Sequence, residues 1–276
     1  MGDSRKKIVH LCLSSFYIDG FSYQENLIPK YNRLAGNDVT VIASLVSFDS
    51  KGKPCLLKEA KEYISESNFK VIRLNYNRRF YVLSKYIRKY EFLYNHLNNE
   101  KPDILFIHDF SFYDILTVIK YLNENRHVKV YVDCHTDFIN SGQTWFSKNI
   151  LHKKVWRFIG RRLLDPFVTK YYGTTPLRSS FLEEVYKLPK GKIEYLEMGL
   201  DDSLINNLSN HKEQKKNLLE SYKIPIANKM IATGGKIDSL KNIHLLIDLF
   251  LDGKISGATL FVFGTFSHEL EYYKEK

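Results

Sequence analysis

Short apolar runs alternate with longer amphipathic stretches along most of this 276-residue chain. The runs read as buried strands and lie at Lys7–Leu13, Val39–Ala43, Phe69–Leu74, Ile104–Ile107, Val128–Val132 and Ile193–Leu196, with a further strand that ends at Tyr171–Gly173. Strands separated by helices predict a parallel sheet that is covered on both faces. We therefore expect an α/β fold whose ligands bind at the carboxyl ends of the strands.

Local signals predict the ends of several helices. Ser22-x-x-Glu25 has the form of a capping box that starts a helix, and Gly36 ends that helix. Ser111 is expected to cap the helix between the fourth and fifth strands. Thr175-Pro176 predicts another helix start, with proline at the first helical position.

A polar stretch at Asn206–Lys216 is the best linker in the chain and predicts two domains, 1–205 and 206–276. Beyond it, the pattern predicts a helix at about Lys212–Tyr222. A strand at Lys229–Thr233, a helix at Asn242–Leu251 and a strand at Ala258–Phe263 follow. This is a single β-α-β unit, and a two-stranded sheet makes a weak core by itself.

A glycine-lysine segment stands at the end of the predicted strand at Lys229–Thr233. Gly234 and Gly235 follow that strand, and Lys236 and Lys241 precede the helical pattern. Glycines allow a backbone to approach a ligand closely, and a helix N-terminus with two ammonium groups favours an anion. The segment predicts a diphosphate clamp, although a tight turn with two solvated lysines explains the same residues equally well.

The formal net charge of +10, from 41 Lys and Arg against 31 Asp and Glu, favours anionic partners. Nucleotide phosphates, acidic lipid surfaces and nucleic acid all fit this charge. No RRM, KH, helix-turn-helix or zinc-finger pattern occurs, which argues against nucleic acid. Three scattered cysteines predict neither a disulfide framework nor a zinc site. With no export signal or membrane-spanning run, we expect a cytoplasmic protein.

Several phrases, taken in order, resemble the retaining glycosyltransferases of family four, which have the GT-B fold. They are Tyr23–Tyr31, Val39–Ser44, His135-Thr136-Asp137, Glu197–Asp201 and Thr233–Lys236. The resemblance implies an N-terminal, acceptor-side Rossmann-type domain followed by part of a second Rossmann-type domain for a nucleotide-sugar donor. Members of that family run further, and the part beyond would hold the paired-glutamate donor motif.

Sugar transfer requires that the charge on the leaving diphosphate be stabilised and that water be excluded. The sequence contains no Asp-x-Asp motif, so we expect no metal, and we expect Lys236 and Lys241 to supply the positive charge. Lys236 takes a place often held by arginine in the family, and lysine supplies a point charge rather than a bidentate fork. No cofactor is expected beyond the nucleotide sugar, which is a substrate.

The resemblance implies that His135 is the active-site histidine, which contacts or positions the donor sugar. From the residues alone, a structural histidine at a strand end is the alternative, and the flanking Asp133 and Asp137 could orient its ring in either case. By the same resemblance, Gly20 corresponds to a glycine of a donor-binding loop, where this chain has one glycine and the family commonly has two. Further expected substrate contacts are Asp19, Tyr23, His108, Asp109 and Asp137.

Two stretches, Tyr76–Leu97 and Trp145–Phe167, combine basic and aromatic residues. Such helices either lie on an anionic membrane or pack their apolar faces on the sheet with solvated charges. The sequence is therefore compatible with a cytoplasmic protein and with one that binds peripherally to the inner face of the cell membrane.

The leading hypothesis is a retaining, metal-independent hexosyltransferase that acts on a cell-surface polysaccharide or a lipid-linked glycan. An alternative is a truncated, non-catalytic glycosyltransferase-like protein, because the sequence stops soon after a predicted strand. A nucleic-acid-binding protein is the second alternative.

Overall fold

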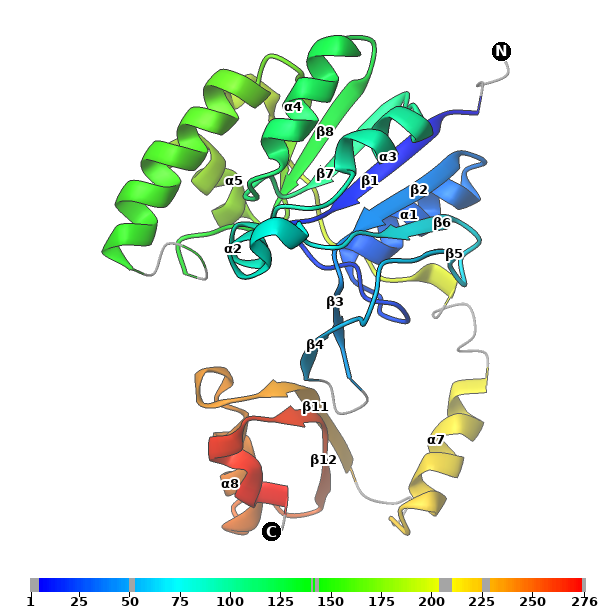
Figure 1. The fold of residues 1–276 in the computed structure, drawn as a ribbon. Helices are drawn as coiled ribbons and strands as arrows, with labels where there is room; N and C mark the ends of the chain where they lie inside the picture. The colour runs from blue at the N-terminus through cyan, green and yellow to red at the C-terminus, as the bar shows by residue number, and fades with distance from the viewer. Residues whose placement is uncertain are drawn as a thin grey trace. The chain divides into compact units, whose positions relative to one another are not determined.

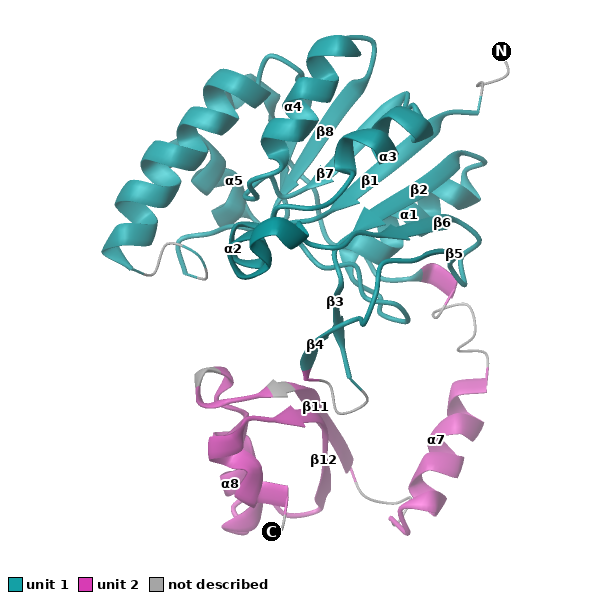
Figure 2. Ribbon diagram, in the orientation of Figure 1, with its two compact units in different colours: residues 1–49, 54–201 teal, residues 50–53, 202–276 magenta. Residues whose placement is uncertain are grey.

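The computed structural model describes residues 5–49, 53–139, 141, 144–203, 210–224 and 229–274. The chain divides into two compact units (Figure 2). Unit 1 comprises residues 1–49 and 54–201, and unit 2 comprises residues 50–53 and 202–276. Residues 206–209 of the expected linker lie outside the described part.

Unit 1 is built on an eight-stranded sheet with the order β10-β9-β8-β7-β1-β2-β6-β5 (Figure 1). The strands are β1 (Lys7–Cys12), β2 (Asp38–Ala43), β5 (Glu62–Ile64), β6 (Lys70–Arg73), β7 (Ile104–His108), β8 (Lys129–Cys134), β9 (Val168–Gly173) and β10 (Ile193–Tyr195). All neighbouring strands are parallel except β5 and β6, which are antiparallel. The predicted α/β fold with a mostly parallel sheet is confirmed.

The helices of unit 1 are α1 (Gln24–Leu34), α2 (Tyr81–Ile87), α3 (Leu93–Glu100), α4 (Ile115–Glu124) and α5 (Pro176–Glu184). A long helix also contains two π-helical stretches, η2 (Ser147–Trp156) and η3 (Ile159–Leu164). The short 3₁₀ turns are η1 (Arg78–Phe80) and η4 (Lys190–Lys192), and β3 (Val46–Phe48) pairs with β4 (Pro54–Leu56) outside the main sheet. None of the helices in the described ranges has both the length and the apolar composition needed to cross a membrane.

The two faces of the sheet differ in chemistry. Alternate residues such as Val9, Leu11, Leu105 and Ile107 join the main hydrophobic cluster with side chains of α3, α4, η3 and α5. Because successive residues of a strand point to opposite faces, His10 and His108 lie on the other face, which α1 covers. The face below α1 therefore carries polar groups inside an otherwise apolar sheet.

Two of the predicted helix starts were wrong. Helix α1 begins at Gln24 after Tyr23, with no side-chain cap, so Ser22 does not form a capping box with Glu25. Helix α4 begins at Ile115 with Asp114 at its N-cap position, so Ser111 does not cap it. The predicted Thr175 cap is confirmed, since its hydroxyl accepts a hydrogen bond from the amide of Arg178.

Unit 2 contains a two-stranded parallel sheet of β11 (Lys229–Ile237) and β12 (Ala258–Phe266). Helix α8 (Ile243–Leu251) connects them after the turn η6 (Ser239–Lys241), while α7 (His211–Ser221) precedes them and η7 (His268–Lys274) follows. Its buried cluster is small, with Ile237, Ile247, Leu270 and Tyr273. The predicted single β-α-β unit is thus present.

The expected strand end at Thr233 was wrong, because β11 continues through both glycines and Lys236 to Ile237. Gly235 has a φ of 109° and pairs in register with Gly264, whose φ is 125°. A Cβ on Gly264 would lie 1.9 Å from the carbonyl oxygen of Gly235. The absence of side chains here allows the two strands to stay paired.

Candidate functional site

His135 directly follows β8 and lines a cavity of about 720 Å³ in unit 1. Ser14, after β1, and Asp109, after β7, line the same cavity. The carboxyl ends of three parallel strands therefore meet at one place, as the parallel sheet predicts. The rest of the lining is largely apolar and aromatic, with Tyr86, Tyr113, Leu151, Val155 and Trp156.

The imidazole of His135 lies between two carboxylates. Its Nε2 atom is 3.3 Å from Asp133 Oδ1 and 3.6 Å from Glu25 Oε1. The ring N–H is aligned for a hydrogen bond with neither oxygen, so charge rather than a formed hydrogen bond holds this nitrogen. Burial by itself would lower the pKa of His135, but the carboxylates of Asp133, Glu25 and Asp109 raise it to about 9. The ring is therefore an imidazolium at neutral pH.

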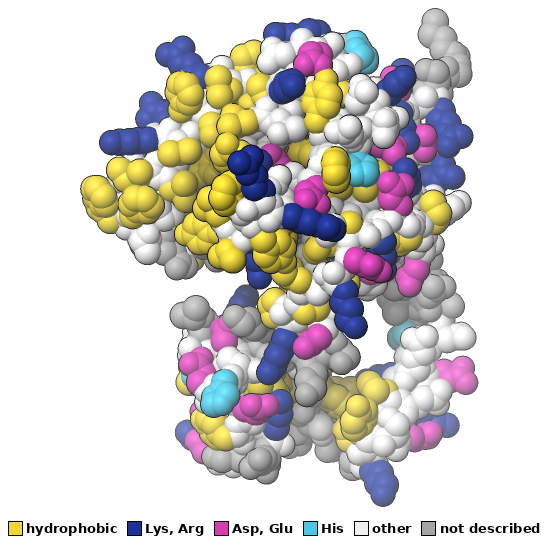
Figure 3. Space-filling view, viewed as in Figure 1, with side chains coloured by type: hydrophobic (Ala, Val, Ile, Leu, Met, Phe, Trp, Pro, Cys, Tyr) yellow, Lys and Arg dark blue, Asp and Glu magenta, His cyan; other side chains and the backbone are white. Residues whose placement is uncertain are grey.

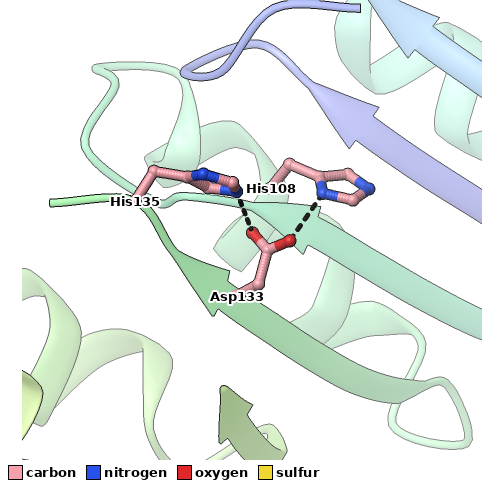
Figure 4. A group of neighbouring side chains, drawn as sticks. All are labelled: His108, Asp133 and His135. Atoms are coloured by element: carbon pink, nitrogen blue, oxygen red, sulfur yellow. Dashed lines mark hydrogen bonds and ion pairs between the residues drawn. The ribbon is translucent and has the colours of Figure 1, made fainter. Parts of the chain in front are cut away.

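Asp133 is fully buried, and a buried carboxylate is costly unless it is well hydrogen-bonded. The Nδ1 atom of His108 lies 2.8 Å from its Oδ2, and the backbone amide of Asp109 donates to its Oδ1 at 3.2 Å. Figure 4 shows His108 and His135 on the two sides of this carboxylate. Burial would raise the pKa of Asp133, but the two histidines hold it well below its usual value.

A polar chain continues behind His108 on the face of the sheet below α1. His108 Nε2 lies 3.1 Å from His10 Nδ1, and His10 Nε2 lies 3.0 Å from the side-chain nitrogen of Asn32 on α1. Burial and the neighbouring His108 lower the pKa of His10 well below its usual value, so this ring is neutral. His108 was expected to contact substrate, but it is fully buried and reaches the cavity only through Asp133 and His135.

Three of these side chains could hold a metal ion, because His108, Asp133 and His135 each offer a ligand atom within 4.8 Å of the others. However, both ring nitrogens of His108 and both oxygens of Asp133 already have polar partners. Their lone pairs and protons are used within the chain of hydrogen bonds. We therefore treat the group as a hydrogen-bonded assembly and assign no metal to it.

Asp109 and Asp137, two further expected contacts, are nearly buried and organise the loops after β7 and β8. Asp109 accepts hydrogen bonds from the hydroxyl of Thr136 at 2.7 Å and from the amide of Ser111 at 2.8 Å. Asp137 accepts from the amide of Ile139 at 2.9 Å and lies 3.5 Å from Arg178 Nε. Of the two, Asp109 lines the cavity beside His135.

Asp19 and Gly20 line a different cavity of unit 1, of about 460 Å³. The carboxylate of Asp19 accepts from the hydroxyl of Tyr63 at 2.7 Å and pairs with the buried Arg73 at 2.9 Å. Tyr23, which was grouped with them, stacks on Phe21 and is 46% exposed. Asp19 and Gly20 thus belong to a second polar site, which is distinct from the cavity beside His135.

The expected donor-binding residues Gly234, Gly235, Lys236 and Lys241 all belong to unit 2. Lys241 is exposed at the end of η6, and the side chain of Lys236 lies outside the described residues. The carboxylate of Asp238 accepts a hydrogen bond from the amide of Lys241 at 3.0 Å, which shapes the turn before α8.

Three residues near His135 were not expected from the sequence. Glu25 was interpreted as part of a helix cap. His10 is the one histidine within the apolar strand β1, and a polar side chain at such a position could have indicated a buried polar site. Arg88 lines the cavity and donates to the hydroxyl of Ser14 at 2.8 Å. Its left-handed backbone, with a φ of 60°, ends α2 and brings the guanidinium to this position.

Several solved structures have folds similar to that of this chain. A glycosyltransferase from Rickettsia africae ESF-5 matches with a TM-score of 0.59 and 15% identity, over 99% of this chain and 63% of that one. A UDP-forming α,α-trehalose-phosphate synthase from Burkholderia vietnamiensis matches with a TM-score of 0.53 and 10% identity, over 98% of this chain and 67% of that one. A UDP-GlcNAc 2-epimerase from Neisseria meningitidis matches with a TM-score of 0.50 and 14% identity, over 97% and 67%.

No protein-family model and no curated protein matches the sequence. The structural matches show that the chain has a GT-B-like α/β fold, which confirms the predicted fold class. The chain spans 63% of the length of the Rickettsia glycosyltransferase. At these sequence identities the comparison establishes the fold alone, and any inference about activity must come from the residues of the site.

Proposed function

We propose that this chain is a glycosyltransferase of the GT-B type, similar to family four, that transfers a hexosyl group from a nucleotide sugar with retention and without a metal ion. The observation that carries the proposal is His135, an imidazolium at the carboxyl end of β8 beside a cavity of about 720 Å³. The GT-B-like fold and the Gly-Gly-Lys segment of β11 support it.

The protonation state restricts what His135 can do. An imidazolium has no free lone pair, so it cannot accept a proton from an acceptor hydroxyl at neutral pH. It can donate a hydrogen bond to a sugar hydroxyl or to a diphosphate oxygen, and it adds positive charge where negative charge develops. We assign His135 to donor-sugar positioning and charge stabilisation, with Lys236 and Lys241 as diphosphate-binding residues.

The experiment measures nucleotide release and product formation by the purified chain with a panel of nucleotide sugars. We expect turnover that is unaffected by chelator, and loss of most turnover in His135→Ala. Since a 2-epimerase shares this fold, the sugar products are identified by chromatography. A free epimerised sugar nucleotide, without transfer to an acceptor, would contradict the transferase assignment.

Nucleotide binding is measured separately by titration calorimetry with UDP and GDP. Lys241→Ala removes one ammonium group and is expected to weaken binding, whereas Lys254→Ala, another exposed lysine of unit 2, serves as the matched control. Equal affinities for both variants and the wild type would remove Lys241 from the clamp. Lys236→Ala is tested in the same way.

For the acceptor, we propose a cell-surface polysaccharide or a lipid-linked glycan, reached from the inner face of the cell membrane. Exposed apolar side chains flank the cavity on two segments, with Phe80, Val82 and Tyr86 on one and Trp145, Phe146 and Phe158 on the other. Figure 3 shows apolar side chains gathered over this part of unit 1, with basic side chains around them. Arg78, Arg79, Lys85, Lys148, Lys153 and Lys154 supply basic groups on the same segments.

An apolar surface with a basic surround fits an anionic bilayer, where each Lys or Arg near the surface contributes about 1 kcal/mol. In a flotation assay, we expect the protein to be recovered with vesicles of phosphatidylglycerol and phosphatidylcholine. We expect no recovery with vesicles of phosphatidylcholine alone. Trp145→Ser with Phe146→Ser should abolish recovery, while Phe92→Ser with Tyr195→Ser, exposed elsewhere on unit 1, should not. Equal recovery of both double variants would reject this surface.

A further inference from the structure

The polar residues below α1 form one continuous path that runs from His135 along one face of the sheet to Asn32 on α1. His10, His108 and Asp133 come from β1, β7 and β8, which are neighbours in the sheet. His108 and Asp133 are register partners, and His10 is paired with Phe106, two residues before His108. The three side chains therefore share one face and touch in sequence.

Helix α1 closes this path at both ends. Asn32 meets His10 at one end, and Glu25 lies 3.6 Å from His135 at the other. The two residues are about two helical turns apart, so they project from the same side of α1. Packing of a single helix thus determines both ends of the path.

The proton positions follow from the partners. The amide nitrogen of Asn32 can only donate, so His10 Nε2 accepts and the one proton of the neutral ring lies on Nδ1. His10 Nδ1 then donates to His108 Nε2, which leaves the proton of His108 on Nδ1, where it donates to Asp133. Each N–H on the path from Asn32 through His10 to His108 therefore donates in the direction of the Asp133 carboxylate, and each of these hydrogen bonds has one donor and one acceptor.

We infer that His10, His108 and Asp133 are positioning residues for His135, and that their aligned hydrogen bonds hold the Asp133 carboxylate in the one orientation that faces the His135 ring. The inference rests on the proposed function of His135. Its Nε2 edge is buried against the two carboxylates. The Nδ1 edge has no hydrogen-bond partner among the described residues and is the edge available to a ligand in the cavity.

The arrangement is tested by NMR of the protein labelled with ¹⁵N-histidine, recorded across a pH series, because ring nitrogen shifts report tautomer and charge. Wild-type His10 and His108 are expected to be neutral Nδ1–H tautomers, and His135 is expected to stay charged at pH 8. A His10 ring in the Nε2–H form would overturn the inferred direction of the path. The charged groups that face His135 are Glu25 from α1, Asp133 from β8 and Asp109 after β7.

Asn32→Asp is the sharpest variant, because Asn32 is half-buried on a helix and the change is isosteric. A carboxylate accepts where the amide donated, so His10 should switch to the Nε2–H tautomer, and its Nδ1 should then accept a hydrogen bond from the Nε2–H of His108. Asn123→Asp, the same change at an exposed position of α4, is the control and should alter no histidine tautomer. An unchanged His10 tautomer in Asn32→Asp would reject the path.

Substitution of His108 connects the path to turnover. His108→Phe removes the donor to Asp133, whereas the amide nitrogen of His108→Asn can take the place of Nδ1 and restore it. We expect kcat to fall roughly 10-fold to 100-fold in His108→Phe, with partial recovery in His108→Asn and little change in KM. A purely structural role would lower the melting temperature and leave the ring spectrum of His135 unchanged.

The two proposals fail in distinguishable ways. If the wild-type chain transfers no sugar but its histidine spectra show the expected tautomers, the proposed function fails and the path stands. If transfer occurs but the spectra of His135 do not respond to Asn32→Asp or to His108→Phe, the path fails and the function stands.

Discussion

Lys30 Nζ lies 2.6 Å from Asp201 Oδ2, and this ion pair joins α1 to the end of unit 1 across 171 positions of sequence. The hydroxyl of Tyr31 donates to the other oxygen of Asp201 at 3.2 Å. The side chains of Lys30 and Asp201 are largely shielded from solvent, with 21% and 9% of their surfaces exposed. Two sequence segments that resemble the family, Tyr23–Tyr31 and Glu197–Asp201, are therefore in contact in the fold.

Removal of this carboxylate should destabilise unit 1. Asp201→Ala leaves Lys30 partly buried without this carboxylate, and breaking a shielded pair in this way costs about 2 to 4 kcal/mol. Urea unfolding measures the loss. Glu220→Ala breaks the exposed pair with Lys216 on α7 and should cost less than about 0.5 kcal/mol. Equal effects of the two substitutions would show that Asp201 contributes no more than a surface charge.

The central strands of unit 1 could be predicted because each is a short apolar run bounded by polar residues. β3, β4 and β5 could not, since each spans only 3 residues, and Pro54 at the start of β4 is disfavoured inside a sheet. They are short strands, and antiparallel pairing with a strand nearby in the sequence determines them. The end of β11 was missed because paired glycines in facing strands are visible only once the register is known.

The position of His135 after a strand could be predicted, and the family resemblance singled it out, but its surroundings could not be predicted. The contacts between Asp133, His108 and His10 require β7 to lie between β8 and β1, and this strand order follows from crossover connections rather than from any local pattern. Glu25 had a plausible local role as a helix cap, which the start of α1 at Gln24 removes. The carboxylate is turned toward His135 instead.

Arg73 is expected to be a structural residue that supports Asp19 beside the cavity of about 460 Å³. Its fully buried guanidinium donates to the carbonyl oxygens of Tyr17 at 2.9 Å and Ser44 at 3.0 Å, and it pairs with Asp19. Arg73→Met leaves both carbonyls without this donor and should cost about 2 to 5 kcal/mol in urea unfolding. Asp19→Asn, whose side chain is half-exposed, should cost about 1 kcal/mol or less. A reversed order would mean that the carboxylate, rather than the carbonyl pair, retains the arginine.

Gly264 should tolerate no side chain. Gly264→Ala would bring a Cβ to 1.9 Å from the oxygen of Gly235 at a φ of 125°, so β11 and β12 must separate locally. We expect a loss of at least about 2 kcal/mol, measured as a lower melting temperature. Gly253→Ala has a positive φ of 68° in open space and tests the backbone cost alone, about 1 kcal/mol. Similar losses for both variants would show that the strands adapt to the added carbon.

The charge state of His135 predicts a pH dependence of stability with a definite sign. Its folded pKa of about 9 lies above the usual histidine value, so the protonated ring stabilises the folded chain. This contribution is complete below about pH 6.5, fades between about 6.5 and 9, and is absent above that range. His135→Gln lacks the titration, so the difference in unfolding free energy between wild type and variant should shrink by up to roughly 3 kcal/mol from pH 6 to pH 10. Other groups titrate in both proteins and cancel in the difference. A difference that stays constant or grows with pH would show that the carboxylates of Asp133 and Glu25 do not stabilise a charged ring.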